Sequence, residues 1–437
     1  MTSTDVLATR RPVASAAARF GADALTNTFG RNLQFLVTLL TIPLIARSLG
    51  PQEFGLYGLS TAAYFFGSSI VDGGLSTALA GRVATSSPAA FLVLRRQYLG
   101  VRGLLFAVVL LSGVGVLIAP WWLYVWIGLC AGGISSTGEE WVLVARGHFA
   151  SVVAMQWAGR LTYLAALVGG MAWQASPAVP AVCLSLGGAV TSWLSWRRVG
   201  WSRRSHGPIA MRSSQAPSGE RVPGVAALLR LGAPALVARA LSASYGQSST
   251  LLVSAGVAGA ALGTYTAADR AVRALLGVVD SLVITMLPRM VRAWAAGAAQ
   301  RRAVLLLTLA SVATGGALAG ALYVSAPVVV ALLYGHGFAA TTAVLRTAVW
   351  IIPSACVTSM LTTNVLMLKQ RTGAVLVVYT VGAAAACAGL FSLAGGATAT
   401  TVASRLVLAE AAAAATALAL CLRRRSTRSG RRETEER

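Results

Sequence analysis

The chain alternates between long apolar runs and short polar stretches along most of its length. Because an α-helix rises 1.5 Å per residue, about 20 apolar residues cross the hydrocarbon core of a bilayer, and the runs predict about twelve such helices. The stretch from Pro327 to His336 fits either an extension of the helix before it or a short element on the outer face. We expect spanning helices near 22–46, 54–79, 98–119, 121–145, 149–173, 178–196, 226–254, 261–288, 303–325, 341–368, 373–393 and 397–421.

The polar stretches group these helices into two sets. Residues 197–225 are rich in Ser, Pro, Gly and Arg and lack an apolar stripe, which is typical of a linker. We therefore expect an N-terminal bundle over 22–196 and a C-terminal bundle over 226–421, with charged tails at 1–21 and 422–437. The predicted fold class is an all-α polytopic membrane protein built from two pseudo-symmetric six-helix bundles.

Basic residues indicate the orientation of the helices. Most of the 36 Lys and Arg residues lie in the tails or in every second gap between apolar runs, whereas the other gaps hold little besides Arg47 and Arg346. The Arg-rich gaps contain Arg82, Arg95 and Arg96, then Arg146, then Arg197 to Arg221, then Arg289 to Arg302, then Lys369 and Arg371. Because positive charge resists translocation, these gaps and both termini are expected in the cytoplasm of a cell whose plasma membrane the chain spans.

Composition excludes several classes of protein. The chain is 56% hydrophobic and 11% charged, with a mean hydropathy of +0.70, whereas soluble chains carry about 25% charged residues. A net charge of +23 would suggest nucleic-acid binding in a soluble protein. Here the charge is divided among short loops, which favours membrane topology and attraction to anionic lipid headgroups, and no nucleic-acid partner is expected.

The sequence carries no recognisable catalytic or cofactor motif. The cysteines form no CxxC pair and the three histidines (His148, His206 and His336) are scattered, so we expect no metal site and no catalytic residue. A GxxxxGK[ST] phosphate loop is missing, and no cofactor is expected. Energy for any transport would come from an ion gradient, the substrate gradient or a partner.

The two halves show an internal repeat at a shift of 208 positions. Residues that are rare inside apolar runs match, namely Arg31 with Arg239, Tyr57 with Tyr265 and Asp72 with Asp280, and Gly55 also matches Gly263. Such parallel repeats, related by an axis along the membrane normal, often enclose a transport site near the midplane.

One segment resembles a known family. The sequence Leu49-Gly50-Pro51, the Glu53-Phe54-Gly55-x-Tyr57 that follows it, and Asp72-Gly73-Gly74-Leu75 are similar to the signature of Wzx-type polysaccharide and O-antigen flippases. These belong to the multidrug/oligosaccharidyl-lipid/polysaccharide (MOP) exporter superfamily.

The resemblance implies a MATE-like, V-shaped pair of bundles and alternating access. It also implies that the substrate is a polyprenyl-diphosphate-linked oligosaccharide, moved from the inner to the outer leaflet for cell-surface polysaccharide or lipopolysaccharide biosynthesis. Glycosyltransferases and a polysaccharide polymerase are then candidate partners.

Charges within the apolar runs mark candidate site residues, since a charge inside the bilayer costs about 2.5–3.5 kcal/mol on insertion scales. Tyr265, Asp269, Arg273 and Asp280 share one stripe of a helix, and Arg270 stands beside it. This stripe predicts a cavity wall, although an Asp269–Arg273 ion pair that only neutralises the helix is the alternative. Arg160 and Arg405 lie near mid-depth, Arg405 with Glu410 as its nearest acidic residue. The predicted cationic cavity therefore comprises Arg160, Arg270, Arg273 and Arg405, with Asp269 and Tyr265.

The repeated pairs suggest a gate. We expect Arg31 to pair with Asp72 and Arg239 with Asp280, bracing each bundle on its cytoplasmic side. The alternatives are that Arg31 snorkels to the headgroups and that the Asp residues accept hydrogen bonds between packed helices or carry protons.

Other functions remain open at this level. A MATE-like ion-coupled exporter of small molecules would favour a cavity of carboxylates and aromatic rings. Lipid II flippases usually carry helices beyond twelve, and an integral-membrane transferase would need a catalytic His or carboxylate cluster.

Overall fold

The computed structural model describes residues 11–76, 79, 83, 88–146, 148–201, 249–295, 300–369, 371–393 and 397–423, with isolated positions between 224 and 241. All regular elements in this part of the chain are helical. The N-terminal half contains α2 (Arg11–Asp72), α4 (Pro88–Leu111), the 3₁₀ turn η1 (Ser112–Leu117), α5 (Trp122–Ser136), α6 (Glu140–Ala145), α7 (Phe149–Trp173) and α8 (Ala178–Trp201). The C-terminal half contains α10 (Ser249–Val253), α11 (Gly259–Ala295), α12 (Gln300–Leu333), the 3₁₀ turn η2 (His336–Phe338), α13 (Thr341–Ala348), α14 (Ile351–Leu361), the π-helix η3 (Thr362–Met367), α15 (Thr372–Phe391) and α16 (Ala399–Leu422).

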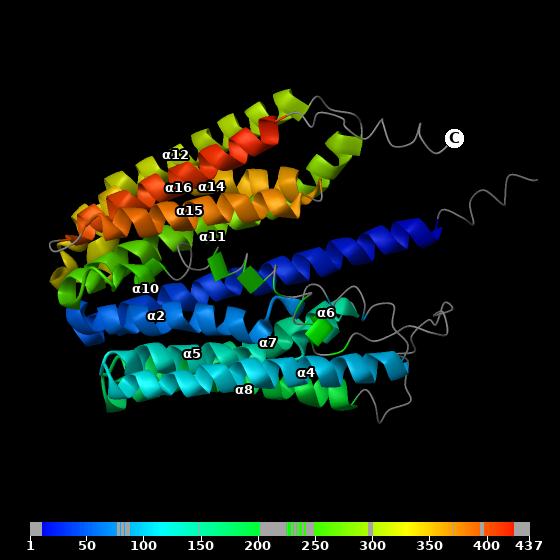
Figure 1. The fold of residues 1–437 in the computed structure, drawn as a ribbon, viewed down its shortest axis with the longest axis horizontal. Helices are drawn as coiled ribbons and strands as arrows, with labels where there is room; N and C mark the ends of the chain where they lie inside the picture. Colours follow the sequence, from blue (N-terminus) through cyan, green and yellow to red (C-terminus); the bar gives the residue numbers. More distant parts are fainter. Residues whose placement is uncertain are drawn as a thin grey trace, which may run out of the picture.

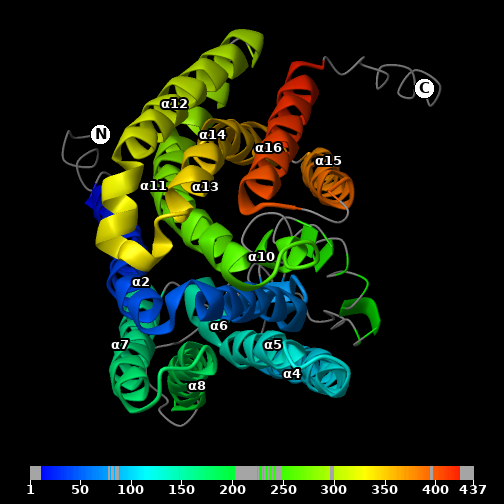
Figure 2. The ribbon, with the colours of Figure 1, turned by 90° about the vertical axis from the view of Figure 1, so that its left-hand side faces the viewer.

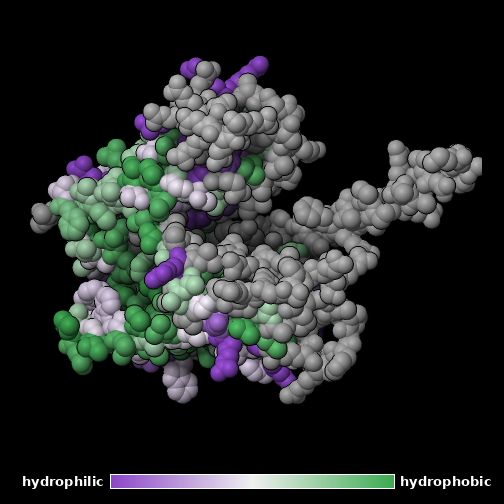
Figure 3. Space-filling model, turned by 45° about the vertical axis from the view of Figure 1, so that its right-hand side comes forward, coloured by the Kyte–Doolittle hydropathy of each residue, from purple (hydrophilic) through white to green (hydrophobic). Residues whose placement is uncertain are grey.

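Six helical segments of the described chain are long and apolar enough to cross a membrane. They cover 90–117, 178–200, 301–333, 341–367, 372–391 and 399–422. Their exposed faces are rich in Leu, Val and Trp, and Figure 3 shows hydrophobic residues over much of the described surface on one face of the molecule. The chain is a membrane protein, and the expected total of about twelve spans stays a prediction.

Glycines divide the first long helix. Gly50 has φ 70° and ψ 175°, a conformation that glycine adopts without steric cost, and it bends α2 sharply. Pro51 follows, and proline suits the first turn of a helix because that turn needs no N–H donor. Gly73 (φ 61°) and Gly74 (φ 68°) then end the helix after Asp72. The two helices predicted near 22–46 and 54–79 are therefore the two arms of α2.

Two other segments differ from expectation. The helix predicted over 121–145 is broken between Ser136 and Glu140 into α5 and α6. Of the two alternatives for the stretch from Pro327, the structure shows the helix extension, because α12 continues to Leu333 before the short turn η2. Helix α2 begins at Arg11, within the segment expected to be a tail.

The two halves of the chain form separate groups of helices that meet along α2. Figures 1 and 2 show the N-terminal half on one side and the C-terminal half on the other, with α2 and α11 between them. Within the described residues, the extensive packing between halves always involves α2, above all against α11. The end of the molecule that contains Gly50, here named the outer end, is the end that the Arg distribution predicts to face outside. The opposite end is named the inner end.

Repeat-related glycines form the centre of the α2–α11 contact. A Cβ atom added at Gly55 would lie 3.0 Å from the backbone N of Gly263, and one added at Gly263 would lie 1.6 Å from the Pro51 carbonyl oxygen. A Cβ at Gly58 would lie 2.5 Å from the Thr266 side chain. Because lipid provides no hydrophobic force between helices, such small residues allow the close backbone packing that holds membrane helices together.

Aromatic rings close the junction at the outer end. The Phe54 ring of α2 is fully buried and meets the rings of Tyr334 and Phe338 at centroid distances of 5.9 and 5.5 Å. The Tyr334 hydroxyl donates to the Ala267 carbonyl at 2.8 Å, and Arg47 Nη2 donates to the Leu332 carbonyl at 2.7 Å. The ring contacts of Phe54 and the Arg47–Leu332 hydrogen bond join the two halves of the chain, so the structure is closed at its outer end.

Candidate functional site

The predicted stripe on α11 forms a compact network inside the C-terminal half. Asp269 accepts from Arg273 Nε at 2.8 Å and from Nη2 at 2.9 Å, so the i,i+4 ion pair is present. Ser249 of α10 bonds to all three members, receiving the Tyr265 hydroxyl at 3.1 Å and Arg273 Nη2 at 3.1 Å and donating to Asp269 at 3.3 Å. Tyr265 and Asp269 are 1% and 4% exposed. This part of the stripe therefore joins α11 to α10, and only Arg273 is partly exposed.

Arg270 has a different environment from Arg273. Its Nε and Nη2 atoms are buried and contact no hydrogen-bond partner among the residues that the structure describes. The guanidinium interacts electrostatically with Tyr163 of α7 and with Tyr265 and Tyr334 of the C-terminal half. The Tyr163 hydroxyl in turn bonds Thr41 of α2. Arg270 therefore lies where the two halves meet, near tyrosines of both halves, and no described carboxylate forms an ion pair with it.

Arg160 belongs to a polar cluster of the N-terminal half. It interacts electrostatically with Tyr64 and with Glu140 of α6. Gln156 Nε2 donates to Glu140 Oε2 at 2.8 Å, and the Tyr64 hydroxyl bonds the Ser135 side chain. Tyr163, which neighbours Arg270, lies about one turn from Arg160 along α7. The cluster is thus near the same junction but contains its own acidic group.

Arg405 lies apart from these residues. Its Cβ packs on α15, where a Cβ added at Gly389 would be 3.1 Å away. Glu410 instead interacts with Thr358 and Arg273, and no ion pair joins it to Arg405 in the described chain. The four arginines of the predicted cavity therefore lie in four different environments.

The two repeat-related Asp residues also differ. Asp72 is buried and accepts from Arg102 Nη2 at 3.2 Å, the Tyr98 hydroxyl at 2.9 Å and the Ser76 hydroxyl at 2.9 Å. Asp280 is exposed and accepts from Ser359 of α14 at 3.1 Å. The side chain of Arg31 and the whole of Arg239 lie outside the described residues, so their expected pairing with these Asp residues stays a prediction.

Sequence patterns did not predict a role for Arg102, although its contacts hold the inner end of the N-terminal half together. It is 4% exposed, lies 4.1 Å from the centre of the Tyr98 ring and donates from Nη1 to the Gly138 carbonyl at 2.7 Å. That carbonyl belongs to the break between α5 and α6, where Ser195 Oγ also accepts the Glu139 N–H at 2.8 Å. Side chains therefore satisfy the backbone groups that the break leaves free, as a low-dielectric environment requires.

Glu139 is a second buried charge at the inner end. It is fully buried and forms a two-point ion pair with Arg95, Nη2 to Oε2 at 2.8 Å. Arg95, Tyr98 and Arg102 follow the i, i+3, i+7 spacing of one helix face, which was the available signal. Among the described residues, no group of His, Cys, Asp and Glu has the arrangement of a metal site.

Comparison with solved structures identifies the fold. The chain superposes on a structure described as the lipid II flippase MurJ in an inward closed conformation, with a TM-score of 0.68, 12% identity, and coverage of 91% of this chain and 87% of that one. It also superposes on the inward-facing conformation of a multidrug resistance MATE family transporter of the MOP superfamily, with a TM-score of 0.58, 13% identity, and coverage of 90% and 97%. No family model and no curated protein matches the sequence. The chain therefore has the same fold as these two transporters, in agreement with the MATE-like fold that the resemblance implied.

Proposed function

We propose that this protein is a flippase that moves a polyprenyl-diphosphate-linked oligosaccharide from the inner to the outer leaflet of the plasma membrane by alternating access. The observation that carries the proposal is the partly buried Arg270 side chain at the junction of the halves, whose Nε and Nη2 atoms are buried and have no hydrogen-bond partner among the described residues. A charge inside a membrane protein is costly, and one that pairs with no other group typically faces a water-filled cavity or a substrate pathway. Arginine binds diphosphate oxygens with paired hydrogen bonds and stays charged.

The closed outer end supports the direction of transport. Gly55 against Gly263 and Phe54 against Tyr334 seal the junction at that end, so a substrate would approach from the inner end. Opening the outer end would require α2 and α11 to separate. Their contact is extensive, but it is formed largely by glycines and other small residues. The fold likeness to an inward closed flippase agrees with such a state.

Orientation is part of the proposal and has a direct test. Reporter fusions after Arg204 and Arg302 should be cytoplasmic, whereas fusions near Gln52 and Gly396 should be external. An external reporter at Arg204 would show that the assigned orientation, and with it the proposed direction of transport, is wrong.

A MATE-like ion-coupled exporter is the second candidate, favoured by the fold likeness to a MATE transporter and by the half-buried Glu140, which interacts with Arg160. The two candidates predict opposite ligand charge. Near Arg270 a cationic drug would meet an unpaired positive group, whereas a diphosphate would be attracted. Charge selectivity of transport therefore separates them.

The functional experiment uses proteoliposomes with a fluorescent polyprenyl-diphosphate-linked saccharide in the leaflet that faces the inner end. The wild-type protein should transfer it to the other leaflet. Arg270→Ala should reduce the rate of transfer by about 100-fold, equivalent to roughly 3 kcal/mol for a charged hydrogen bond. The rate with Arg270→Lys should be intermediate, because lysine keeps the charge but loses the paired hydrogen bonds. Arg346→Ala, an exposed change, is the control. Unchanged transfer by Arg270→Ala, or transport of a cationic dye in its place, would reject the proposal.

A further inference from the structure

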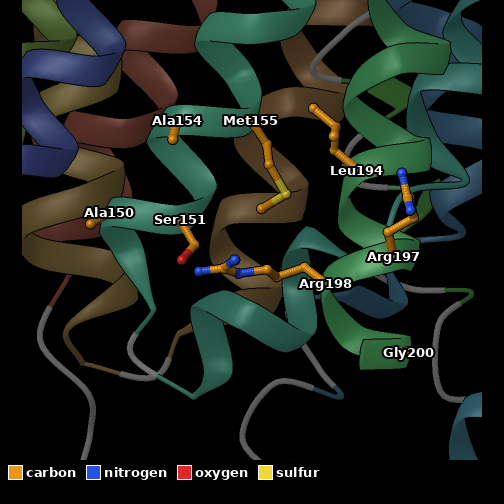
Figure 4. Close-up of a pocket in the computed structure, with 8 residues that line it drawn as sticks. All are labelled: Ala150, Ser151, Ala154, Met155, Leu194, Arg197, Arg198 and Gly200. Carbon is orange, nitrogen blue, oxygen red and sulfur yellow. The ribbon is translucent and has the colours of Figure 1, made fainter. Parts of the chain in front are cut away.

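A groove of about 1050 Å³ lies between the inner ends of α7 and α8. Ser151 and Met155 form its α7 wall, and Leu194, Arg197 and Arg198 form its α8 wall. Figure 4 shows the Arg198 side chain extending from α8 toward Ser151, with Met155 above it. The groove thus combines apolar side chains with the Arg198 guanidinium beside Ser151, whereas the Arg197 side chain points away from Arg198 and lies over Trp193.

The groove faces away from the candidate transport site. At about 100° per residue, Met155 and Arg160 point roughly 140° apart around α7. Ala154, another lining residue, is followed at heptad spacing by Leu161 and Val168, which are 55% and 53% exposed. The groove therefore opens onto the surface of α7 that meets the bilayer.

The α8 wall continues in the same way. Arg197 stacks over the Trp193 ring at 4.7 Å, and Trp193 is 51% exposed. Leu186, two turns before Trp193, is 50% exposed. Trp beside Arg at a helix end is typical of the level of lipid headgroups, with the apolar stripe beyond it at the level of acyl chains.

We propose that the groove binds an anionic phospholipid of the cytoplasmic leaflet. Its phosphate is held by Arg198 with the Ser151 hydroxyl nearby, while Arg197 beside Trp193 adds positive charge at the same headgroup level, and one acyl chain lies against Met155 and Leu194 before it follows the exposed stripe of α7. Charge complementarity selects the anionic headgroup, since each Arg near an anionic lipid adds to the attraction. The site is independent of the transported substrate and would exist in either candidate function.

The test is a binding titration of the purified full-length protein in detergent, read by native mass spectrometry. The probes are dioctanoyl phosphatidylglycerol and, as the zwitterionic comparison, dioctanoyl phosphatidylcholine. We expect the double variant Arg197→Ala with Arg198→Ala to bind phosphatidylglycerol about 10-fold more weakly and to bind phosphatidylcholine unchanged. The matched control is Arg301→Ala with Arg302→Ala, an adjacent exposed pair at the inner end of α12.

A second pair of variants tests the apolar part of the site. Ala154→Trp should fill the groove and weaken phosphatidylglycerol binding while both arginines remain, whereas Ala313→Trp, at an exposed position of α12, should leave it unchanged. Equal losses from the groove and control variants would overturn the proposal, because they would show unspecific adsorption. Preferential displacement of phosphatidylglycerol by undecaprenyl phosphate would also overturn it, because the groove would then belong to a polyprenyl lipid.

Discussion

Two arginines inside the same membrane protein, the buried Arg102 and the partly buried Arg270, occupy opposite kinds of environment. Arg102 holds Asp72 at 3.2 Å and the Gly138 carbonyl at 2.7 Å, and among its guanidinium nitrogens only Nε lacks a partner. Arg270 has no hydrogen bond at Nε or Nη2 within the described chain and is bordered by tyrosines from both halves. The contacts of Arg102 stabilise the fold, whereas the free donor atoms of Arg270 are available to an anionic ligand.

The comparison separates stability from function. Removing one partner of a buried ion pair leaves an uncompensated charge and destabilises the fold. Removing a buried charge that has no partner relieves a desolvation cost, so the fold should be unharmed. Changes at Arg102 and Arg270 are therefore expected to alter the free energy of unfolding with opposite sign as well as different size.

The largest expected effect is at Arg102. Arg102→Ala should lower the free energy of unfolding in detergent by about 3–5 kcal/mol, because Asp72 would lose its cation and the α5–α6 break would lose its donor. Arg346→Ala, whose guanidinium is exposed and stacks on Tyr323, should change it by less than about 0.5 kcal/mol. Adding Asp72→Ala to Arg102→Ala should cost less than the sum of the two single changes. Additive costs would show that the pair is not coupled.

The next effect is at Phe54. Phe54→Ala should weaken the outer closure by about 3 kcal/mol, since this fully buried ring contacts both Tyr334 and Phe338 across the junction. In a chain with its native cysteines replaced, Ala268→Cys should then react faster with a membrane-impermeant maleimide added on the outer side. Phe391→Ala, which removes a ring that is 81% exposed, is the control. Equal labelling of both variants would place the closure elsewhere.

A smaller effect is expected from the glycine contact. Gly263→Ala puts a methyl group 1.6 Å from the Pro51 carbonyl and should force α2 and α11 apart, at a cost of about 1–3 kcal/mol. Gly320→Ala on α12 has open space around it and should be neutral or slightly stabilising. The midpoint of thermal unfolding measures both changes, and an unaffected Gly263→Ala would mean that the halves pack less closely than described.

Sequence patterns predicted some of these features and not others. The Asp269–Arg273 pair was visible because both residues lie on one helix four positions apart. The Arg102–Asp72 pair was not, because 30 residues separate the partners and only the fold brings α4 to the end of α2. Hydropathy also predicted an unbroken helix over 121–145. It could not reveal the break near Gly138, because the backbone groups freed there bond Arg102 and Ser195, which are distant in the sequence.

The repeat illustrates the same limit. Matching Gly55 with Gly263 predicted equivalent places in two halves, and the structure shows the two glycines packed against each other. Matching Asp72 with Asp280 predicted a shared role, whereas Asp72 is buried and Asp280 is exposed. Backbone contacts follow the repeat because they need only small residues, but side-chain environments depend on neighbours that the repeat does not share.

The smallest expected effect is at Ser359. Ser359→Ala removes one hydrogen bond to the exposed Asp280 carboxylate and should cost no more than about 1 kcal/mol of thermal stability. Asp280→Asn should behave similarly if this bond is its main structural role. A loss of several kcal/mol from Asp280→Asn alone would instead indicate the predicted Arg239–Asp280 pair.

The central claim, that Arg270 awaits an anionic ligand, is tested most directly by ligand-induced stabilisation. The midpoint of thermal unfolding is measured for wild-type protein and Arg270→Leu, with and without excess undecaprenyl diphosphate, and with uncharged undecaprenol as the control. A ligand that binds only the folded state raises its stability by about 2.7 kcal/mol at 100 times its Kd. We expect the diphosphate to raise the midpoint of the wild-type protein and not that of Arg270→Leu, which without ligand should be at least as stable as the wild type. Equal stabilisation of both proteins by the diphosphate, or an Arg270→Leu variant as unstable as Arg102→Ala, would contradict the account.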